Sequence, residues 1–443
     1  MEQPDRAFSV THNSVLAIAV PTTLAYLSTP LLGLVDTGVV GRLGAPALLG
    51  GLAVGVIIFD IIFTTFNFLR ASTTGLVAQA LGAGQSEEQR IVLVRSLLLS
   101  VFLGLAVLLL APFILSVGLW AMDAPEAVER ATIAYFTIRI LAAPLTLINY
   151  SVLGWMFGLG QAWLGLVLQL VLNGTNIVLS ILLGLVLGWG IEGVAWATVI
   201  AEGVAAVVGL TIAWLRLSGA GPVSWQSIFD RAALSKLVGV NIDIMVRSFC
   251  LLLAFAFFTA QGAKFGEVTL AANAVLMNFF LIAGYFLDGF ATAAEQLAGR
   301  AVGARHRPAF DSAVRLTLVW GFGLAISASA VFWFGGPFVI DLLTTSEVVR
   351  EEARVYLIWA ALTALIGVMA FQMDGVFIGA TWTVDMRNMM LLSLAAFWLT
   401  WWVATPAWGN HGLWLAMEVF LGIRGLSLLA RLPVRSRQTF GET

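Results

Sequence analysis

The chain has 443 residues, of which 60% are apolar and only 11% are charged, and its mean hydropathy is +0.95. A soluble domain carries about 25% charged residues, so most of this chain must lie in lipid. The formal net charge of −2 excludes the basic excess of a nucleic-acid-binding protein. A single cysteine excludes internal disulfides, and three scattered histidines give no metal-ligand spacing, which argues against a metalloenzyme or a redox protein.

The first apolar segment follows a polar N-terminus, Met1 to Asn13, and runs from Val15 to Val40. It is too long for the apolar region of a secretory signal and is interpreted as a spanning helix. Eleven breaks in the apolar pattern then divide the chain into twelve segments long enough to cross a bilayer. The breaks fall near 41–42, 82–90, 121–128, 158–162, 188–192, 217–235, 264–267, 303–308, 335–350, 380–387 and 405–411. Long apolar runs exclude the alternating strands of a membrane barrel, so the predicted fold is an all-α polytopic membrane protein with twelve transmembrane helices.

The basic residues are distributed unevenly over the two sides of this topology. Fourteen of the 23 Lys and Arg residues fall in loops and helix ends on the side of the N-terminus, and five fall on the other side. Cytoplasmic loops carry the excess of positive charge, so both termini are expected in the cytoplasm.

Short motifs recur at an offset of 219–222 residues, which indicates a repeat at half length. The paired motifs are Gly44-Ala-Pro-Ala-Leu-Leu-Gly-Gly-Leu-Ala with Gly266-Glu-Val-Thr-Leu-Ala-Ala-Asn-Ala-Val, Gln79-Ala-Leu-Gly-Ala with Arg300-Ala-Val-Gly-Ala, and Gly160-Gln-Ala-Trp with Gly379-Ala-Thr-Trp. We therefore expect two pseudo-symmetric six-helix lobes, 1–216 and 236–443, around a central cleft, joined by a cytoplasmic loop, 217–235. Substrate sites in such transporters tend to lie between repeats near the midplane.

Carboxylates inside the apolar segments are costly, at roughly 2.5–3.5 kcal/mol each at the bilayer centre, and each needs a reason. The candidates are Asp36, Asp60, Glu202, Asp243, Asp288, Glu295, Asp374 and Glu418. Asp36 is distinctive because no Lys or Arg lies within four residues of it. Burial without a cationic neighbour favours the neutral form, so this carboxyl is a candidate for reversible proton binding at physiological pH. Pro21, fifteen residues earlier, predicts a kink in the same helix.

The fifth expected helix offers partners for this acid. Asn173, Asn176 and Ser180 have the i, i+3, i+7 spacing that places them on one helix face. Thr198, in the sixth helix, and the Asn149-Tyr150 pair, in the fourth, add polar groups to the same half. The alternative role for these amides is hydrogen bonding between helices, with no part in transport.

The second half carries its own polar candidates. Asp243 precedes Arg247 by four residues, so the two share a helix face and form either a structural ion pair or part of a cavity. Asn273, Asn278, Gln372 and Asp374 could line a cavity, but their spacing singles out none of them. Asp60 and Glu418 are flanked by apolar residues and are interpreted as structural. Arg70 and Arg139 are expected to pair with a carboxylate or to extend towards the bilayer surface.

The segment Leu34-Val-Asp-Thr-Gly-Val-Val-Gly-Arg-Leu-Gly resembles the first-helix signature of the multidrug and toxic compound extrusion (MATE) family. Four further segments resemble its DinF-like branch: Phe68-Leu-Arg-Ala-Ser-Thr-Thr-Gly-Leu-Val-Ala-Gln-Ala, Asn241-Ile-Asp-Ile-Met-Val-Arg-Ser, Tyr285-Phe-Leu-Asp-Gly-Phe-Ala and Met373-Asp-Gly-Val-Phe-Ile-Gly-Ala-Thr. The resemblance covers essentially the whole chain. It implies an exporter of lipophilic, often cationic compounds that exchanges them for protons or sodium.

The resemblance also assigns expected roles to individual residues. Asp36 corresponds to the first-lobe coupling carboxylate and Pro21 to the proline at which the first helix bends. Asn176 and Thr198 match polar residues around that carboxylate, and Asn149 and Tyr150 match pocket residues; Asn173 is added as a third pocket candidate. The family pattern Asn-x-x-x-Asp in the fifth helix reads Asn176 to Ser180 here, so one carboxylate is lost. Because hard cations favour charged oxygen ligands, we expect protons and not sodium as the coupling ion.

The sequence thus predicts a proton-coupled multidrug antiporter that works by alternating access, coupled through Asp36 and bending at Pro21. Asn176, Ser180 and Thr198 complete the expected coupling site, and Asp243, Arg247 and Asp374 are the second-lobe candidates. It is expected to need no cofactor or metal, to bind small lipophilic or cationic substrates and membrane lipid, to be monomeric, and to lie in a bacterial inner membrane. The alternatives are a sodium-coupled exporter and a flippase for a lipid-linked precursor, which would need a strongly basic cavity. A membrane enzyme is disfavoured because clustered His, Asp or Ser nucleophile motifs are missing from the sequence.

Overall fold

The computed structural model describes residues 8–217 and 224–441. Within these ranges the chain forms twelve helical segments long and apolar enough to cross a membrane, as the sequence predicts, and no strands. The segments are His12–Gly41, Pro46–Gly82, Ser86–Met122, Glu126–Gly158, Ala162–Val186, Gly190–Leu217, Trp225–Ala263, Glu267–Gly303, Arg307–Leu343, Glu347–Gly379, Thr383–Trp408 and Asn410–Phe440. Backbone groups in lipid must be satisfied within the segment, which is why these apolar runs are helical.

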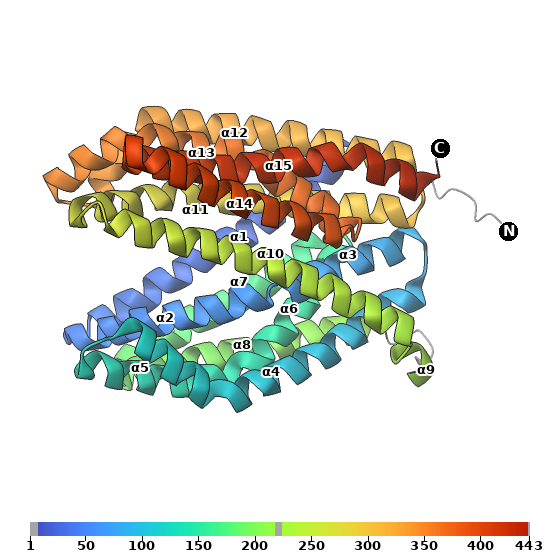
Figure 1. Ribbon diagram of the computed structural model, residues 1–443. Helices are drawn as coiled ribbons and strands as arrows, with labels where there is room; N and C mark the ends of the chain where they lie inside the picture. Colours follow the sequence, from blue (N-terminus) through green and yellow to red (C-terminus); the bar gives the residue numbers. More distant parts are fainter. Residues whose placement is uncertain (1–7, 218–223, 442–443) are drawn as a thin grey trace. The chain divides into compact units, whose positions relative to one another are not determined.

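Four of the twelve segments contain a change of helix (Figure 1). The second is α2 (Pro46–Phe66) followed by α3 (Phe68–Gly82), and the fourth is α5 (Glu126–Arg139), a 3₁₀ turn, Ile140–Ala142, and α6 (Ala143–Gly158). The fifth is α7 (Ala162–Leu179) continued by a π-helix, η2 (Ser180–Val186). The seventh is α9 (Trp225–Ile228) before α10 (Arg231–Ala263).

The remaining spans are single helices. They are α1 (His12–Gly41), α4 (Ser86–Met122), α8 (Gly190–Leu217), α11 (Glu267–Gly303), α12 (Arg307–Leu343), α13 (Glu347–Gly379), α14 (Thr383–Trp408) and α15 (Asn410–Phe440). The expected inter-lobe loop 217–235 lies partly outside the described residues, and its later part holds α9 and the first turn of α10. Arg95 of α4 holds this part, because its Nε donates to the carbonyl of Ile228 at 2.9 Å.

The helices form two compact units. Unit 1 contains the chain up to Thr23, the stretch Ala78–Gly84 and the chain from Val238 onward. Unit 2 contains Leu24–Val77 and Gln85–Leu237. Three helices, α1, α3 and α10, therefore contribute to both units, and α1 passes from unit 1 to unit 2 two residues after Pro21.

Close packing at glycines sets the helix contacts within unit 1. The two glycines of the repeated motif, Gly82 of α3 and Gly303 of α11, lie at one helix crossing. A Cβ at Gly82 would overlap the carbonyl oxygen of Arg300, and a Cβ at Gly303 would overlap that of Gln79. Gln79 Nε2 also donates to the carbonyl of Gly379 at 2.8 Å. The contact is reciprocal between corresponding positions of the repeat, so only glycine fits at either one.

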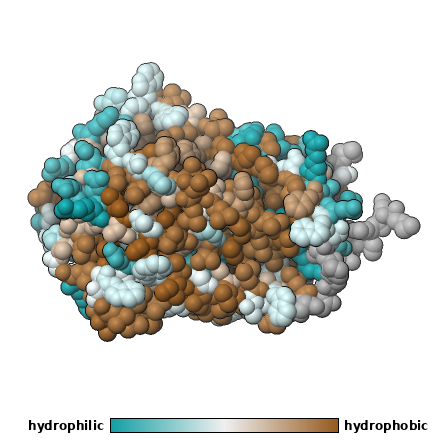
Figure 2. Space-filling model, turned by 90° about the horizontal axis from the view of Figure 1, so that it is seen from below, coloured by the Kyte–Doolittle hydropathy of each residue, from teal (hydrophilic) through white to brown (hydrophobic). Residues whose placement is uncertain are grey.

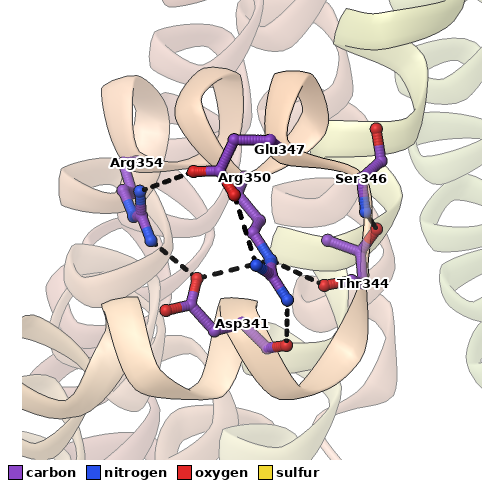
Figure 3. Close-up of polar contacts among 6 residues, drawn as sticks. All are labelled: Asp341, Thr344, Ser346, Glu347, Arg350 and Arg354. Atoms are coloured by element: carbon purple, nitrogen blue, oxygen red, sulfur yellow. Dashed lines mark hydrogen bonds and ion pairs between the residues drawn. The ribbon is translucent and has the colours of Figure 1, made fainter.

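The ends of the spans are closed by polar contacts, as the turn between α12 and α13 illustrates (Figure 3). The guanidinium of Arg350 donates to the carbonyls of Thr344, at 2.8 Å, and Asp341, at 2.9 Å. Arg354 donates to the Asp341 carboxylate at 2.6 Å, and Glu347 pairs with Arg350. Arg350 thereby satisfies carbonyls that the end of α12 leaves without a helical partner. Between such ends the exposed surface is largely apolar, as expected for a lipid-facing protein (Figure 2).

Candidate coupling and substrate site

Asp36 of α1 lies in a buried polar cluster of unit 2 with residues of α7, η2 and α8. Its side chain is 8% exposed. Ser180 Oγ lies 2.7 Å from Asp36 Oδ1 and 3.0 Å from Asn176 Oδ1. Asn176 Nδ2 donates to Thr198 Oγ1 at 2.9 Å, and Thr198 donates to the carbonyl of Val194 at 3.2 Å. The four residues that the sequence analysis proposes for coupling thus form one continuous chain of hydrogen bonds.

The direction of this chain depends on whether Asp36 carries a proton. Ser180 has one hydroxyl hydrogen, which can fully serve only one of its two acceptor neighbours. With Asp36 protonated, Asp36 donates to Ser180, Ser180 to Asn176 and Asn176 to Thr198, so every acceptor in the chain has a donor. With Asp36 ionised, Ser180 turns its hydrogen to the carboxylate and Asn176 Oδ1 loses its donor. A buried acceptor without a donor costs about 1–3 kcal/mol. The free energy of the cluster therefore depends on whether Asp36 carries a proton.

Tight helix packing brings the three helices of this cluster together. The α-helix of the fifth span changes to the π-helix η2 at Ser180, and π-turns inside helices are frequent at functional sites. A Cβ at Gly184 of η2 would lie 2.7 Å from the Val39 side chain, and one at Gly193 of α8 would lie 2.7 Å from the Leu183 backbone. Small residues at these two positions let η2 approach both α1 and α8. The sequence does not predict the π-turn, which lies in an apolar stretch that contains Gly184.

Pro21, the expected hinge, lies inside α1, which continues on both sides of it. Proline has no N–H, so the carbonyl of Ala17 lacks its helical donor. The next residue, Thr22, is buried and contacts the carbonyls of Ile18, at 2.6 Å, and Gly289 of α11, at 3.2 Å. The part of α1 around Pro21 is therefore held by unit 1, whereas Asp36 belongs to unit 2.

Two of the expected pocket residues, Asn173 and Asn149, bond to residues outside the Asp36 cluster. Asn173 Nδ2 donates to Ser28 Oγ of α1 at 2.7 Å. Asn149 Nδ2 donates to Glu202 Oε2 at 2.7 Å and to the backbone carbonyl of Glu202 at 3.0 Å. The third, Tyr150, is half-buried and lies within electrostatic range of Glu202. The partner of Asn149 is thus a buried carboxylate to which the sequence analysis assigns no role.

Arg139 of α5 is the cation of this region. It lies within electrostatic range of Asp36, Asp60 and Glu202. Its guanidinium carbon nevertheless lies over the rings of Phe59 and Phe63, at 5.1 Å from each centroid. Its Nη1 is buried and has no hydrogen-bond partner within the described ranges. The expected pairing of Arg139 with a carboxylate is therefore replaced by cation–π contact, and Asp36 keeps Ser180 as its hydrogen-bond partner.

The second-half candidates of unit 1 are paired differently from the expectation. Asp243 and Arg247 do not neutralise each other: Asp243 accepts from Arg387 and Thr383, at 2.7 and 2.8 Å. Arg247 donates to Asp374 Oδ2 at 2.7 Å, and the buried Arg424 donates to the same oxygen. The expected ion pair between them is wrong because donors on another helix take Asp243 and an acceptor on a third helix, Asp374, takes Arg247.

Two of the other second-half amides, Asn273 and Asn278, make hydrogen bonds within unit 1, whereas the buried Gln372 side chain has no hydrogen-bond partner among the described residues. Asn273 bonds to Asn410 and accepts from Trp414 Nε1 at 2.9 Å, which ties α11 to α15. Asn278 donates to carbonyls of its own helix. Across the described residues no group of three or more His, Cys, Asp or Glu could hold a metal ion.

The MatE family model matches two stretches, residues 21–182 and 244–402, one in each half of the chain. The chain is 40% identical over 420 residues to DNA damage-inducible protein F of Escherichia coli, covering 93% of this chain and 90% of that protein. It is 27% identical over 457 residues to a probable multidrug resistance protein NorM of Deinococcus radiodurans, covering 96% and 95% of the two chains.

Solved structures share the fold. One is the outward-facing conformation of a multidrug resistance MATE family transporter of the MOP superfamily, with a TM-score of 0.85 at 19% identity over 97% of this chain and 96% of that chain. Another is a MOP superfamily transporter from Pyrococcus furiosus, with a TM-score of 0.86 at 19% identity over 98% and 97%. The chain therefore belongs to the MATE family, multi-pass membrane proteins that are secondary transporters in multidrug efflux and not enzymes.

Proposed function

We propose that this protein is a proton-coupled multidrug antiporter in which Asp36 binds the coupling proton and α1 bends at Pro21. The single observation that carries the proposal is the hydrogen-bond chain from Asp36 through Ser180 and Asn176 to Thr198. Only with a proton on Asp36 does every acceptor in this chain have a donor. Protonation is thereby linked to the relative positions of α1, α7 and α8.

In the proposed cycle, ionised Asp36 accompanies a straighter α1 and an open substrate pocket in unit 2. A proton arriving from outside neutralises Asp36, which then donates into the chain. The helix bends at Pro21, where it already lacks one backbone hydrogen bond, and the pocket narrows and releases substrate. A proton moving through roughly 150 mV supplies about 3.5 kcal/mol, enough for an approximately 300-fold gradient of a neutral substrate.

The proposed pocket contains Asn149, Tyr150 and Asn173. Glu202, bonded to Asn149, adds negative charge. Lipophilic cations suit such a pocket because a carboxylate attracts the charge. The proposed partners are therefore small lipophilic or cationic compounds and membrane lipid, without nucleic acid.

The proposed setting is a bacterial inner membrane with both termini in the cytoplasm. This orientation rests on the 14-to-5 asymmetry of basic residues between the two sides of the chain. We propose a monomer whose lobes, 1–216 and 236–443, alternate access for the substrate. Arg95 is one of the fourteen basic residues on the side of the N-terminus. It also holds α9, because its Nε donates to the carbonyl of Ile228.

Protons are favoured over sodium as the coupling ion because Ser180 stands beside Asp36. A hydroxyl offers Na⁺ a neutral oxygen, whereas hard cations prefer several charged ones. Ser180 is instead suited to exchange hydrogen bonds with a protonated or an ionised carboxyl.

The test is ethidium transport by proteoliposomes with imposed pH or sodium gradients. A pH gradient alone should drive uptake by the wild type, and Asp36→Asn should abolish substrate-dependent proton efflux. Asp311→Asn, which removes an exposed carboxylate paired with Arg307, should transport normally. Wild-type proton efflux in Asp36→Asn would refute the assignment of Asp36, and transport driven only by sodium would identify the alternative ion.

A further inference from the structure

Glu418 of α15 is a buried carboxylic acid without a partner. Its side chain is 3% exposed, and neither Oε1 nor Oε2 has a hydrogen-bond partner within residues 8–217 and 224–441. Its neighbours along α15, Met417, Phe420 and Leu421, belong to the apolar core of unit 1. An ionised carboxylate in such surroundings would lose its hydration with nothing to replace it. Burial without a partner therefore favours the neutral, protonated form of Glu418 in this conformation.

The ionisable groups on the helices packed against α15 are engaged elsewhere. At one end of α15, His411 accepts from Trp359 of α13 and contacts the ring of Tyr356. Further along α15, Arg424 bonds Asp374 of α13 and also interacts with Asp288 of α11. At the other end, Asp385 of α14 pairs with Arg431 and Arg435. Cys250 of α10 lies in the apolar core of unit 1, and Glu295 of α11 packs by its backbone against Gly379.

Two polar groups are available to an ionised Glu418 on the helix that packs along α15. Trp401 Nε1 and Thr405 Oγ1, both on α14, are buried and have no hydrogen-bond partner among the described residues. The two helices meet closely, because a Cβ at Gly412 of α15 would lie 2.6 Å from the backbone of Ala404 and Thr405. Glu418 lies on the face of α15 that carries Gly422 and Gly425 and packs on α13, so these donors could reach an ionised Glu418 only after the helices rearrange.

We infer that Glu418 is a second proton-binding site, in unit 1, which is loaded and emptied in each transport cycle together with Asp36. The geometry points to it because the site has a buried acid without a hydrogen-bond partner among the described residues and neighbours along α15 that belong to an apolar core. The step is balanced: the carboxylic acid releases H⁺ to water and the carboxylate takes one up again. This inference rests on the proposed proton coupling and adds one proton to its stoichiometry.

The experiment uses full-length protein in liposomes with the membrane potential clamped to zero and ethidium as the probe. Each coupled proton raises the substrate gradient at static head tenfold per unit of pH difference. At a pH difference of one unit, the ethidium gradient of the wild type should reach about 100-fold and that of Glu418→Gln about tenfold. An Asp36→Asn carrier should build no gradient. Glu418→Met, an apolar side chain of similar volume, should match Glu418→Gln and keeps the test valid if the buried amide impairs folding. Glu347→Gln, at an exposed carboxylate, is the matched control.

Infrared difference spectra of the same proteins between high and low pH give an independent measurement. The protonated-carboxyl signal that changes with pH in Asp36→Asn is assigned to Glu418, and this component should be missing when Glu418→Gln is added to Asp36→Asn. A static-head gradient unaltered by Glu418→Gln, or a Glu418 signal that is missing or constant with pH, would overturn the second site. Failure of the proposed function is distinguishable, since the wild type would then build no gradient from pH while the infrared signal still reports on Glu418.

Discussion

Ser180→Ala is the sharpest perturbation of the proposed coupling cluster, because among the described residues this hydroxyl alone bonds to both Asp36 and Asn176. A hydrogen bond to an ionised group contributes about 1.5–3 kcal/mol and one between neutral groups about 0.5–1.5 kcal/mol. Removing the hydroxyl therefore disfavours the ionised state of Asp36 more than the protonated state, by about 1–1.5 kcal/mol. At 1.36 kcal/mol per pH unit, the pH at half-maximal transport should rise by about one unit.

The assay is ethidium counterflow in proteoliposomes with equal pH on both sides, repeated over a pH series. The variant should be moderately less stable to heat in detergent, since two buried acceptors lose their shared donor. Ser116→Ala is the matched control, because Ser116 is exposed on α4 and bonds only to the carbonyl of Pro112 in its own helix. A Ser180→Ala profile that coincides with that of the wild type would refute the view that this chain senses the proton on Asp36.

Two further substitutions test the structure around the site. Asp374→Asn leaves Arg247 and the buried Arg424 without their counter-ion, and should lower the free energy of unfolding by about 3–5 kcal/mol, measured by thermal or denaturant unfolding in detergent. Gly289→Ala places a Cβ into Thr23 Oγ1 and 2.9 Å from the carbonyl of Ala19, so it should push α1 away beside Pro21 and slow transport severalfold, measured as ethidium flux at constant protein level.

Each of these substitutions has a control elsewhere in unit 1. Asp341→Asn alters an ion-pair network that is about 40% exposed, and should cost no more than about 1 kcal/mol; an equal cost for Asp374→Asn would contradict the buried cluster. Gly239→Ala has nothing within 4 Å of its Cβ and should leave the flux unchanged. Wild-type flux in Gly289→Ala would show that the position of α1 near Pro21 does not limit transport.

Local sequence was sufficient for the twelve helices and for the polar face of α7. Apolar length alone identifies a spanning helix, because lipid leaves the backbone no other hydrogen-bond partner. Helical periodicity places Asn173, Asn176 and Ser180 on one face, and the structure confirms that all three make contacts with other helices or with Asp36. These properties depend on neighbours within a few residues along the chain, which is why the sequence is enough to predict them.

The choice of partners was decided only by the tertiary structure. Asp243 lies one turn from Arg247 but bonds Arg387, 144 residues away, and Asn149 finds Glu202, 53 residues away. The unpartnered state of Glu418 is likewise invisible in sequence, where it is one more acid between apolar neighbours. Periodicity predicts which side chains share a helix face. The hydrogen-bond and ion-pair partners that meet this face belong to other helices. In lipid, where an unmet polar group is costly, it is this packing that decides which acid is paired and which can exchange a proton.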